Sequence, residues 1–319
     1  MDITYLGAEG WLIKRGAHAI LTGPLLSNPG LLSVAINGRI RPDTQWIDRK
    51  LGTPQMRRDL LSVDAILIGH SHYDHLLDVP YVAENFATNA TIWATPSAGH
   101  ILHGDSLLRP IGHVSESDGR LHRVMVIDSS AVGSSTKPGT WIYVARNTIR
   151  FMALESEHRP NVGNYLLAPS LVTRDRDDLP RHANSWRVGE TYAYLIDFLR
   201  PDSSVVFRLY YMDAVARPPL GFPPPLDGPD TAQVTVAILC GGNFEQVADY
   251  PGRLLGVLHP KQVLLGHWEN FFRSQRKSTT VLPFLDASQL ARRLDNAMPD
   301  SSGWVTPALF STTHYCSCR

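Results

Sequence analysis

Four side chains of the types that bind metal ions lie between residues 70 and 75: His70, His72, Asp74 and His75. Neutral imidazoles and a carboxylate suit Zn²⁺ and similar divalent ions. Side chains two residues apart in an extended segment point the same way, so His70 and His72 can share one ion. Asp74 and His75 follow, where a turn can direct them to a neighbouring position. Chance would give this spacing on the order of once in a thousand such chains, so we interpret it as a metal site.

The segment before these residues, 65–69, is a short aliphatic run typical of a strand buried on both faces. Short β-prone runs at 3–6, 11–14 and 19–22 indicate an N-terminal meander, and we expect 27–54 to be irregular because prolines and glycines interrupt it. Further strands are predicted at 90–94, 123–127, 141–145, 149–154, 191–198, 204–211, 233–239 and 262–265. Helices are predicted at 55–62, 79–86, 96–103 and 286–296. The interleaving predicts a single α/β domain over 1–319, with a stiff proline-rich loop at 214–230.

Charge and composition narrow the function. Thirty basic and thirty acidic residues cancel, so no long-range field attracts nucleic acid, and we expect a small-molecule substrate rather than a nucleic-acid partner. No apolar run reaches the ~20 residues of a transmembrane helix, and the N-terminus lacks the layout of a signal peptide. Three cysteines suit a cytoplasmic protein; Cys316 and Cys318 are interpreted as a reduced tail. The oligomeric state stays open.

The pattern His-x-His-x-Asp-His after a buried strand resembles the signature of the metallo-β-lactamase superfamily. The resemblance implies an αββα sandwich of two mixed β-sheets flanked by helices. It also implies a third histidine, a bridging aspartate and a last histidine, each at a strand end. His158 in Glu155-Ser156-Glu157-His158 fits the first of these, with Gly163-Asn164-Tyr165-Leu166-Leu167 similar to the glycine and strand that often follow it. Asp213 after Tyr210-Tyr211-Met212 fits the second, and His267 in Gly266-His267-Trp268 fits the third.

By this resemblance, His70, His72 and His158 hold one ion, Asp74, His75 and His267 hold a second, and Asp213 bridges them. Two divalent ions, zinc first and manganese or iron as alternatives, would generate a bridging hydroxide that cleaves an ester-like bond (lactone, carboxylic ester or phosphodiester). Asp74 and Asp213 are the candidate catalytic proton acceptors. His182 competes with His158, and each of the later ligands also has a purely structural interpretation.

Within the superfamily, the residues of these motifs resemble those of the lactonase-like and phospholipase-D-like branches. Antibiotic-degrading members lack the bridging aspartate, oxygen-reducing di-iron members place a glutamate where His72 stands, and RNA-processing members share all seven ligands but fit the neutral charge poorly. Persulfide-dioxygenase-like members, with one iron, stay open. One departure matters: Gly23 stands where the superfamily often has an aspartate that orients the ligands. A degenerate, non-catalytic metal-binding protein is therefore the alternative.

The residues that shape the substrate site are predicted only by type. Aromatic side chains are common in ligand pockets but more common in cores. The candidates for a pocket wall are Trp46, Trp186, Phe222, Trp268, Phe271 and Phe272. His100 and His103, three residues apart on a predicted helix, are interpreted as a solvated pair.

Overall fold

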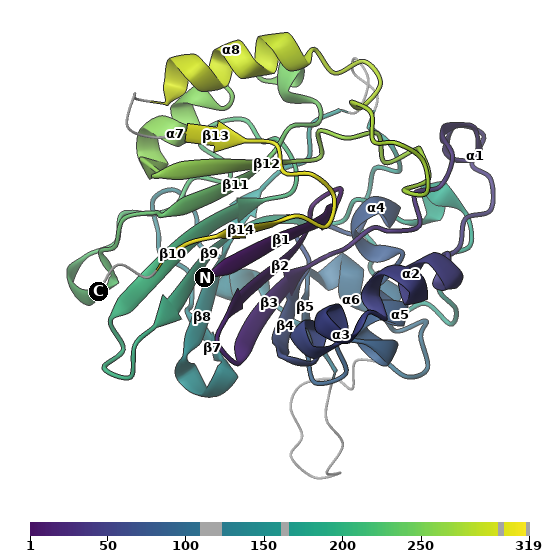
Figure 1. The fold of residues 1–319 in the computed structure, drawn as a ribbon, viewed down its shortest axis with the longest axis horizontal. Helices are drawn as coiled ribbons and strands as arrows, with labels where there is room; N and C mark the ends of the chain where they lie inside the picture. The colour runs from purple at the N-terminus through teal and green to yellow at the C-terminus, as the bar shows by residue number, and fades with distance from the viewer. Residues whose placement is uncertain (109–122, 161–165, 299–302, 317–319) are drawn as a thin grey trace.

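Two seven-stranded β-sheets form the centre of the computed structural model, which describes residues 1–108, 123–160, 166–298 and 303–316 (Figure 1). The first sheet has the order β14-β1-β2-β3-β4-β5-β6 and the second β13-β12-β11-β10-β9-β8-β7. The first contains β1 (Asp2–Gly7), β2 (Gly10–Arg15), β3 (His18–Thr22), β4 (Val63–Leu67), β5 (Thr91–Ala94), β6 (Val124–Val126) and β14 (Thr312–His314). The second contains β7 (Ile142–Val144), β8 (Ile149–Ser156), β9 (Thr191–Leu199), β10 (Val205–Met212), β11 (Val236–Cys240), β12 (Gln262–Gly266) and β13 (Gly303–Val305).

Both sheets are mixed. In the first, the pairings from β14 to β3 are antiparallel and those from β3 to β6 are parallel. In the second, the pairings from β7 to β10 are antiparallel and those from β10 to β13 are parallel. Strands β4, β8, β10 and β12 therefore each end where a loop can carry a polar side chain out of the sheet, which matters for the site described below.

Helices cover the outer faces of the sheets, so the layers run αββα (Figure 1). The helices are α1 (Leu31–Ala35), α2 (Thr44–Leu51), α3 (Pro54–Leu61), α4 (Tyr73–Leu76), α5 (Val79–Asn85), α6 (Pro96–Leu102), α7 (Gly252–Leu258) and α8 (Ala287–Ala297). One apolar cluster lies between the two sheets, where Trp93 of β5 meets Phe151 of β8 at 5.4 Å between ring centroids. Two more clusters pack helices onto the outer faces. The sandwich predicted from the sequence is confirmed.

The predicted strands are present to within a few residues, but the expectation of an irregular segment at 27–54 is wrong. It contains α1 and α2. Asp43 caps α2 by accepting a hydrogen bond from the backbone amide of Trp46, and the helix buries Trp46, Ile47 and Leu51. Pro42 immediately before this cap marks a helix start rather than an interruption. No helix within the described ranges is long and apolar enough to cross a membrane.

The proline-rich segment 214–230 is a loop between β10 and β11, with one short 3₁₀ turn at Gly228–Asp230. Its far end is tied to the second sheet by Arg208, which donates from Nη1 to the carbonyl of Asp230 at 2.9 Å. Arg208 in turn donates to both carboxylate oxygens of the buried Asp197, and Asp197 Oδ2 also accepts from Arg150 Nε at 2.9 Å. Because this paired charge cluster is anchored on three strands, it fixes the loop to the sheet.

Candidate metal centre

The seven side chains predicted to bind metal come together in the structure at one end of the two sheets. His70, His158, Asp213 and His267 lie just past the ends of β4, β8, β10 and β12. Asp74 and His75 belong to the short helix α4, which begins directly after His72. The sequence separates these residues by up to 197 positions (267 − 70), so only the sheet topology brings them together.

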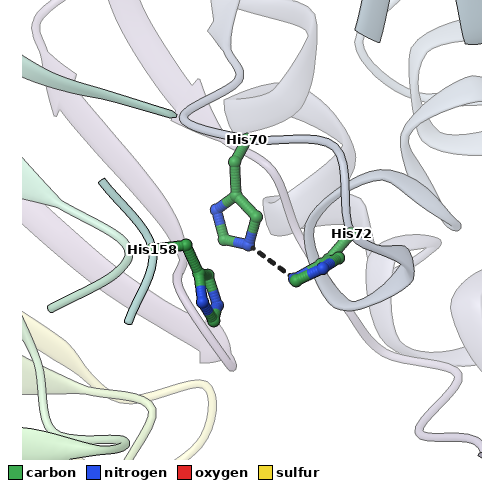
Figure 2. Close-up of side chains that lie close together, drawn as sticks. All are labelled: His70, His72 and His158. Atoms are coloured by element: carbon green, nitrogen blue, oxygen red, sulfur yellow. Dashed lines mark hydrogen bonds between the residues drawn. The ribbon is translucent and has the colours of Figure 1, made fainter. Parts of the chain in front are cut away.

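Three imidazoles form the first group: His70, His72 and His158 (Figure 2). His70 Nε2 lies 3.2 Å from His72 Nδ1. His72 Nε2 lies 2.8 Å from the Leu167 carbonyl and His158 Nδ1 lies 2.7 Å from the Arg159 carbonyl. Each of these two nitrogens must carry a proton to donate to its carbonyl, which leaves the other ring nitrogen as a lone-pair acceptor. That is the tautomer a metal ligand needs.

Asp74, His75 and His267 form a second group, with every member buried. Asp74 Oδ2 lies 3.2 Å from His267 Nε2 and 3.4 Å from His75 Nε2. Burial alone would raise the pKa of Asp74, but the imidazoles of His75 and His267 together hold it well below its usual value. Asp74 is therefore a carboxylate, with the charge needed to bind a cation.

Asp213 lies between the two groups. Its Oδ1 is 3.1 Å from His70 Nδ1 and its Oδ2 is 3.6 Å from His75 Nδ1, and these three residues form a third close set. The backbone of Gly69 packs directly against this carboxylate: a Cβ built on Gly69 would lie 2.6 Å from Asp213 Oδ1 and closer still to Oδ2. A glycine at position 69 is thus what allows the Asp213 carboxylate to reach His70 and His75.

The donor set fits divalent ions because several of its buried polar atoms have no hydrogen-bond partner. The buried atoms without a hydrogen bond include His70 Nδ1, both ring nitrogens of His75, both carboxylate oxygens of Asp213 and His267 Nδ1. The 3.1 Å approach of His70 to Asp213 lacks hydrogen-bond geometry. Each such atom costs roughly 1–3 kcal/mol if nothing satisfies it, and a divalent cation between Asp213, His70 and His75 would satisfy most of them.

Burial also sets the protonation that metal binding requires. Desolvation lowers the pKa of His72 and of His158 to about 3, and lowers that of His70 well below its usual value. Burial likewise raises the pKa of Asp213, against the opposing effect of nearby imidazoles. The neutral imidazoles are ready to bind a cation at neutral pH, and a cation beside Asp213 would favour its ionised form.

Two buried glutamates that sequence reasoning missed support the centre. Glu269 accepts hydrogen bonds from the amide of Ala8, at 2.6 Å, and from the hydroxyl of Tyr5. Ala8 in turn accepts from the amide of His267 at 2.7 Å, which helps to hold His267 in a left-handed conformation with φ of 54°. Glu9 accepts from Trp11 Nε1 at 3.0 Å and packs on Gly266, whose added Cβ would lie 2.5 Å from either carboxylate oxygen. In the sequence, the only hint of these buried carboxylates is the pair of neighbouring glycines, Gly10 and Gly266.

Position 23 is filled by backbone rather than by a carboxylate. A Cβ on Gly23 would collide with the carbonyl oxygen of His75, so no side chain fits here without moving the ligand loop. The nearby carboxylate belongs to Asp78. It is fully buried and accepts from Leu26 N at 2.7 Å, Ser27 N at 2.9 Å and Ser27 Oγ at 2.5 Å. Asp78 thereby ties the loop after β3 to the segment that carries Asp74 and His75.

A cleft of about 380 Å³ opens beside the two groups and is lined by Asp74, His158, Asp213 and His267. Of the six aromatic candidates, Phe271 and Phe272 line it. The other four candidates, Trp46, Trp186, Phe222 and Trp268, are not among the residues that line this cleft. Trp186 and Phe222 face other hollows, and Trp46 is buried under Lys50.

The competing histidines lie elsewhere. His182 is exposed and pairs through Nδ1 with the carbonyl of Asn37 at 3.0 Å, so it is not an alternative to His158. His100 and His103 flank the exposed Asp175, at 2.7 Å and 3.6 Å. Gly163, Asn164 and Tyr165, quoted for their resemblance, lie outside the described residues, as does Cys318. Cys316 is exposed and unpaired.

Comparisons with known proteins agree with this geometry. Residues 38–166 match the family described as Beta-lactamase superfamily domain. No curated protein matches the chain by sequence. Igni18, a metallo hydrolase from Ignicoccus hospitalis, is similar in fold, with a TM-score of 0.52 at 12% identity and 99% of each chain covered.

Two further solved structures are similar in fold. An isothiocyanate hydrolase from Delia radicum gut bacteria gives a TM-score of 0.51 at 14% identity, with 99% of each chain covered. CmlA, a diiron β-hydroxylase from Streptomyces venezuelae, gives 0.52 at 13% identity, covering 98% of this chain and 54% of that one. At these identities the likeness concerns the fold. Together with the two seven-stranded sheets, it shows that the chain has the metallo-β-lactamase fold, and residues 38–166 match a domain of the β-lactamase superfamily.

Proposed function

We propose that this protein is a dinuclear metal-dependent hydrolase that cleaves an ester-like bond (lactone, carboxylic ester or phosphodiester) in a small molecule. The observation that carries the proposal is the set of unpartnered, buried ligand atoms in two adjoining groups that open on one cleft. Two divalent ions in such a site supply a water-derived nucleophile at neutral pH and a Lewis acid for the bond under attack.

The residues of the chain divide the work by position. His70, His72 and His158 would hold one ion; Asp74, His75 and His267 would hold the other; Asp213 would bridge them. Because Asp74 and Asp213 both line the cleft, they are also placed to accept a proton as the product leaves. Five imidazoles and two carboxylates favour zinc over harder ions, with manganese or iron as alternatives.

The partner calls follow from the same features. Both sheets contribute ligands, so we propose that residues 1–319 act as one domain with the site between its halves. The balanced charge and the cleft of about 380 Å³ beside the ligand groups suit a small molecule rather than nucleic acid. A cytoplasmic location remains our proposal, and it rests on the three cysteines.

Two other functions are candidates: a non-catalytic metal-binding protein and an oxidative enzyme. A degenerate metal protein was suggested by Gly23, but Asp78 supplies a buried carboxylate against the same loop, so this motive is weaker. The similarity to a diiron β-hydroxylase raises oxidation as a second candidate. Imidazole ligands suit zinc and iron alike, so the metal that the protein holds and the reaction that it then carries out separate the two candidates.

The test begins with metal content. We expect close to two equivalents of zinc in protein purified without chelator, and loss of at least one in His70→Ala and in His267→Ala. The matched control is His182→Ala, which removes an exposed imidazole. The metal-loaded protein is then assayed on bis(p-nitrophenyl) phosphate, p-nitrophenyl acetate and a simple γ-lactone. Less than one equivalent of metal would overturn the dinuclear site. Bound metal with no hydrolysis, but with oxygen consumption after iron loading, would favour the hydroxylase.

A further inference from the structure

The outer wall of the metal cleft is apolar. Phe271, Phe272, Leu282 and Phe284 line it on the side of the segment after β12, and Leu31 of α1 lines it from across the mouth. The wall starts at the metal centre itself, because the Phe271 ring meets His267 edge-on at 4.6 Å between centroids. It continues to Phe272, 4.3 Å from Phe271. An apolar path therefore runs from a metal ligand to the solvent.

Phe284 marks the open end of this path. Its side chain is 92% exposed, and its backbone is left-handed with φ of 70°. An aromatic residue rarely adopts this conformation, which costs energy that the rest of the fold must supply. Leu31 is also 45% exposed. Asn28, just before α1, donates from Nδ2 to the Arg273 carbonyl at 2.9 Å, so α1 and the segment after β12 are joined where they approach (Figure 1). Exposed apolar groups gathered at a cleft mouth indicate a binding surface.

One cation faces the inner end of the same cleft. Among the residues that line it, Arg159 is the basic one. Its Nε is buried and has no partner, and its Nη1 lies 3.8 Å from Glu157. Glu157 is already engaged by Arg217, whose Nε and Nη2 donate to it at 2.8 Å and 3.0 Å. The Arg159 guanidinium thus has free donors beside His158, and a buried donor without a partner calls for an acceptor.

We infer that the cleft selects an amphiphilic substrate: an apolar chain lies along Phe271, Phe272, Leu282 and Phe284, and an anionic group is bound by Arg159. This inference rests on the proposed hydrolase function and names the substrate class for that site. A cleft of about 380 Å³ holds about a dozen groups of the size of a water molecule or methylene. That is the size of a medium-chain acyl or alkyl group together with one carboxylate or phosphate.

The binding experiment uses permanently anionic probes that are poor metal ligands. Zinc-loaded full-length protein is titrated calorimetrically with octane-1-sulfonate, butane-1-sulfonate and octan-1-ol. We expect octane-1-sulfonate to bind at least about tenfold more tightly than butane-1-sulfonate, because four more methylenes lose part of their water contact. Arg159→Gln should weaken sulfonate binding about fivefold to tenfold and leave octan-1-ol unchanged.

Variants of the apolar wall distinguish binding in the cleft from nonspecific hydrophobic binding elsewhere on the protein. Leu282→Asn and Phe272→Ala should each reduce the preference for the longer sulfonate to about threefold or less. The control is Leu107→Ser, which removes an exposed apolar side chain that does not line the cleft; its affinities should match those of the parent protein. Equal affinity for both sulfonates would overturn the apolar path, and an unchanged affinity in Arg159→Gln with full zinc content would overturn the anion site.

A catalytic arm keeps this inference distinct from the proposed function. The kcat/KM of the zinc-loaded protein is compared for p-nitrophenyl octanoate and p-nitrophenyl acetate. Hydrolysis of both with no preference for octanoate would refute the substrate class and leave the hydrolase standing. Hydrolysis of neither ester, nor of bis(p-nitrophenyl) phosphate or the γ-lactone, would refute the hydrolase, and the sulfonate titration would then decide by itself whether the cleft binds amphiphilic anions.

Discussion

Replacing Gly69 with alanine would drive a methyl group into the carboxylate of Asp213. A Cβ at position 69 would lie 2.6 Å from Asp213 Oδ1, with Oδ2 and Cγ nearer still. The Gly69 backbone cannot easily retreat, because its carbonyl accepts from the amide of Tyr192 at 2.8 Å and the carbonyl of Ile68 accepts from the hydroxyl of Tyr194 at 2.8 Å. The strain must therefore move Asp213.

The size of the effect follows from that geometry. Non-bonded heavy atoms are most stable roughly 3.5 Å apart, so the Asp213 carboxylate must shift by about 1 Å. A shift of that size at a group that positions a reacting atom costs about 100-fold in rate, and a disturbed metal ligand lowers metal affinity about tenfold or more. Overpacking in the core adds roughly 1–3 kcal/mol of destabilisation.

The assay pairs metal content after dialysis with thermal unfolding and ester hydrolysis. The control is Gly256→Ala in α7, where an added Cβ meets nothing within 4 Å; we expect it to keep its metal and to gain about 0.5–1 kcal/mol of stability. Gly69→Ala should lose metal and activity together. If it keeps both and only its melting temperature falls, then Asp213 is not a metal ligand and the reasoning is wrong.

Three other perturbations test the surroundings of the site. Burial lowers the folded-state pKa of His72 and of His158 to about 3, below the ~6.5 of an unfolded chain; the unfolded state therefore binds more protons between these values. Metal-free protein should lose stability as pH falls below about 6.5, by at most about 1.4 kcal/mol per pH unit for each histidine; an unchanged melting temperature between pH 7 and pH 5 in chelator would contradict this. Asp197→Ala leaves two buried arginines without their partner and should cost roughly 3–5 kcal/mol in urea unfolding while metal content stays normal; loss of metal would point to a wider role. Asp78→Asn should weaken metal binding about tenfold to 100-fold in a competition titration, whereas Asp2→Asn, which changes an exposed carboxylate of β1, should have no effect.

The positions of the candidate metal ligands could be predicted because most of them follow a strand that can be recognised from its own residues. The aliphatic run before His70 and the apolar, β-prone segments before His158 and Asp213 are local patterns, which can be recognised without knowledge of the partner strands. The sequence could not predict the distance between Asp213 and the two groups of candidate ligands. That distance depends on the glycine at 69 and on the packing of one sheet against the other.

The features that sequence reasoning missed are held by contacts between distant segments. Glu269 is tied to Ala8 and Tyr5, more than 250 residues away, and nothing near Glu269 distinguishes it from a surface carboxylate. The aromatic residues of the cleft were equally ambiguous, because Phe271 and Trp186 are alike in type and both are buried. The sequence can indicate that an aromatic residue is buried, but only the fold shows whether it packs in the core or lines the cleft.

The case of position 23 shows how an absent residue can mislead. Comparing one position suggested a lost carboxylate and hence a weakened metal site. In the structure the space that a side chain would need at Gly23 is occupied by the carbonyl of His75, so the loop that carries Asp74 and His75 packs directly against the end of β3. A carboxylate still joins the two segments, but it comes from the other side: Asp78, three residues after His75, accepts from the amides of Leu26 and Ser27. Since such a contact constrains both segments equally whichever one carries the charge, the orienting role does not require an aspartate at position 23. The glycine is then a consequence of the closer packing rather than evidence against a working centre.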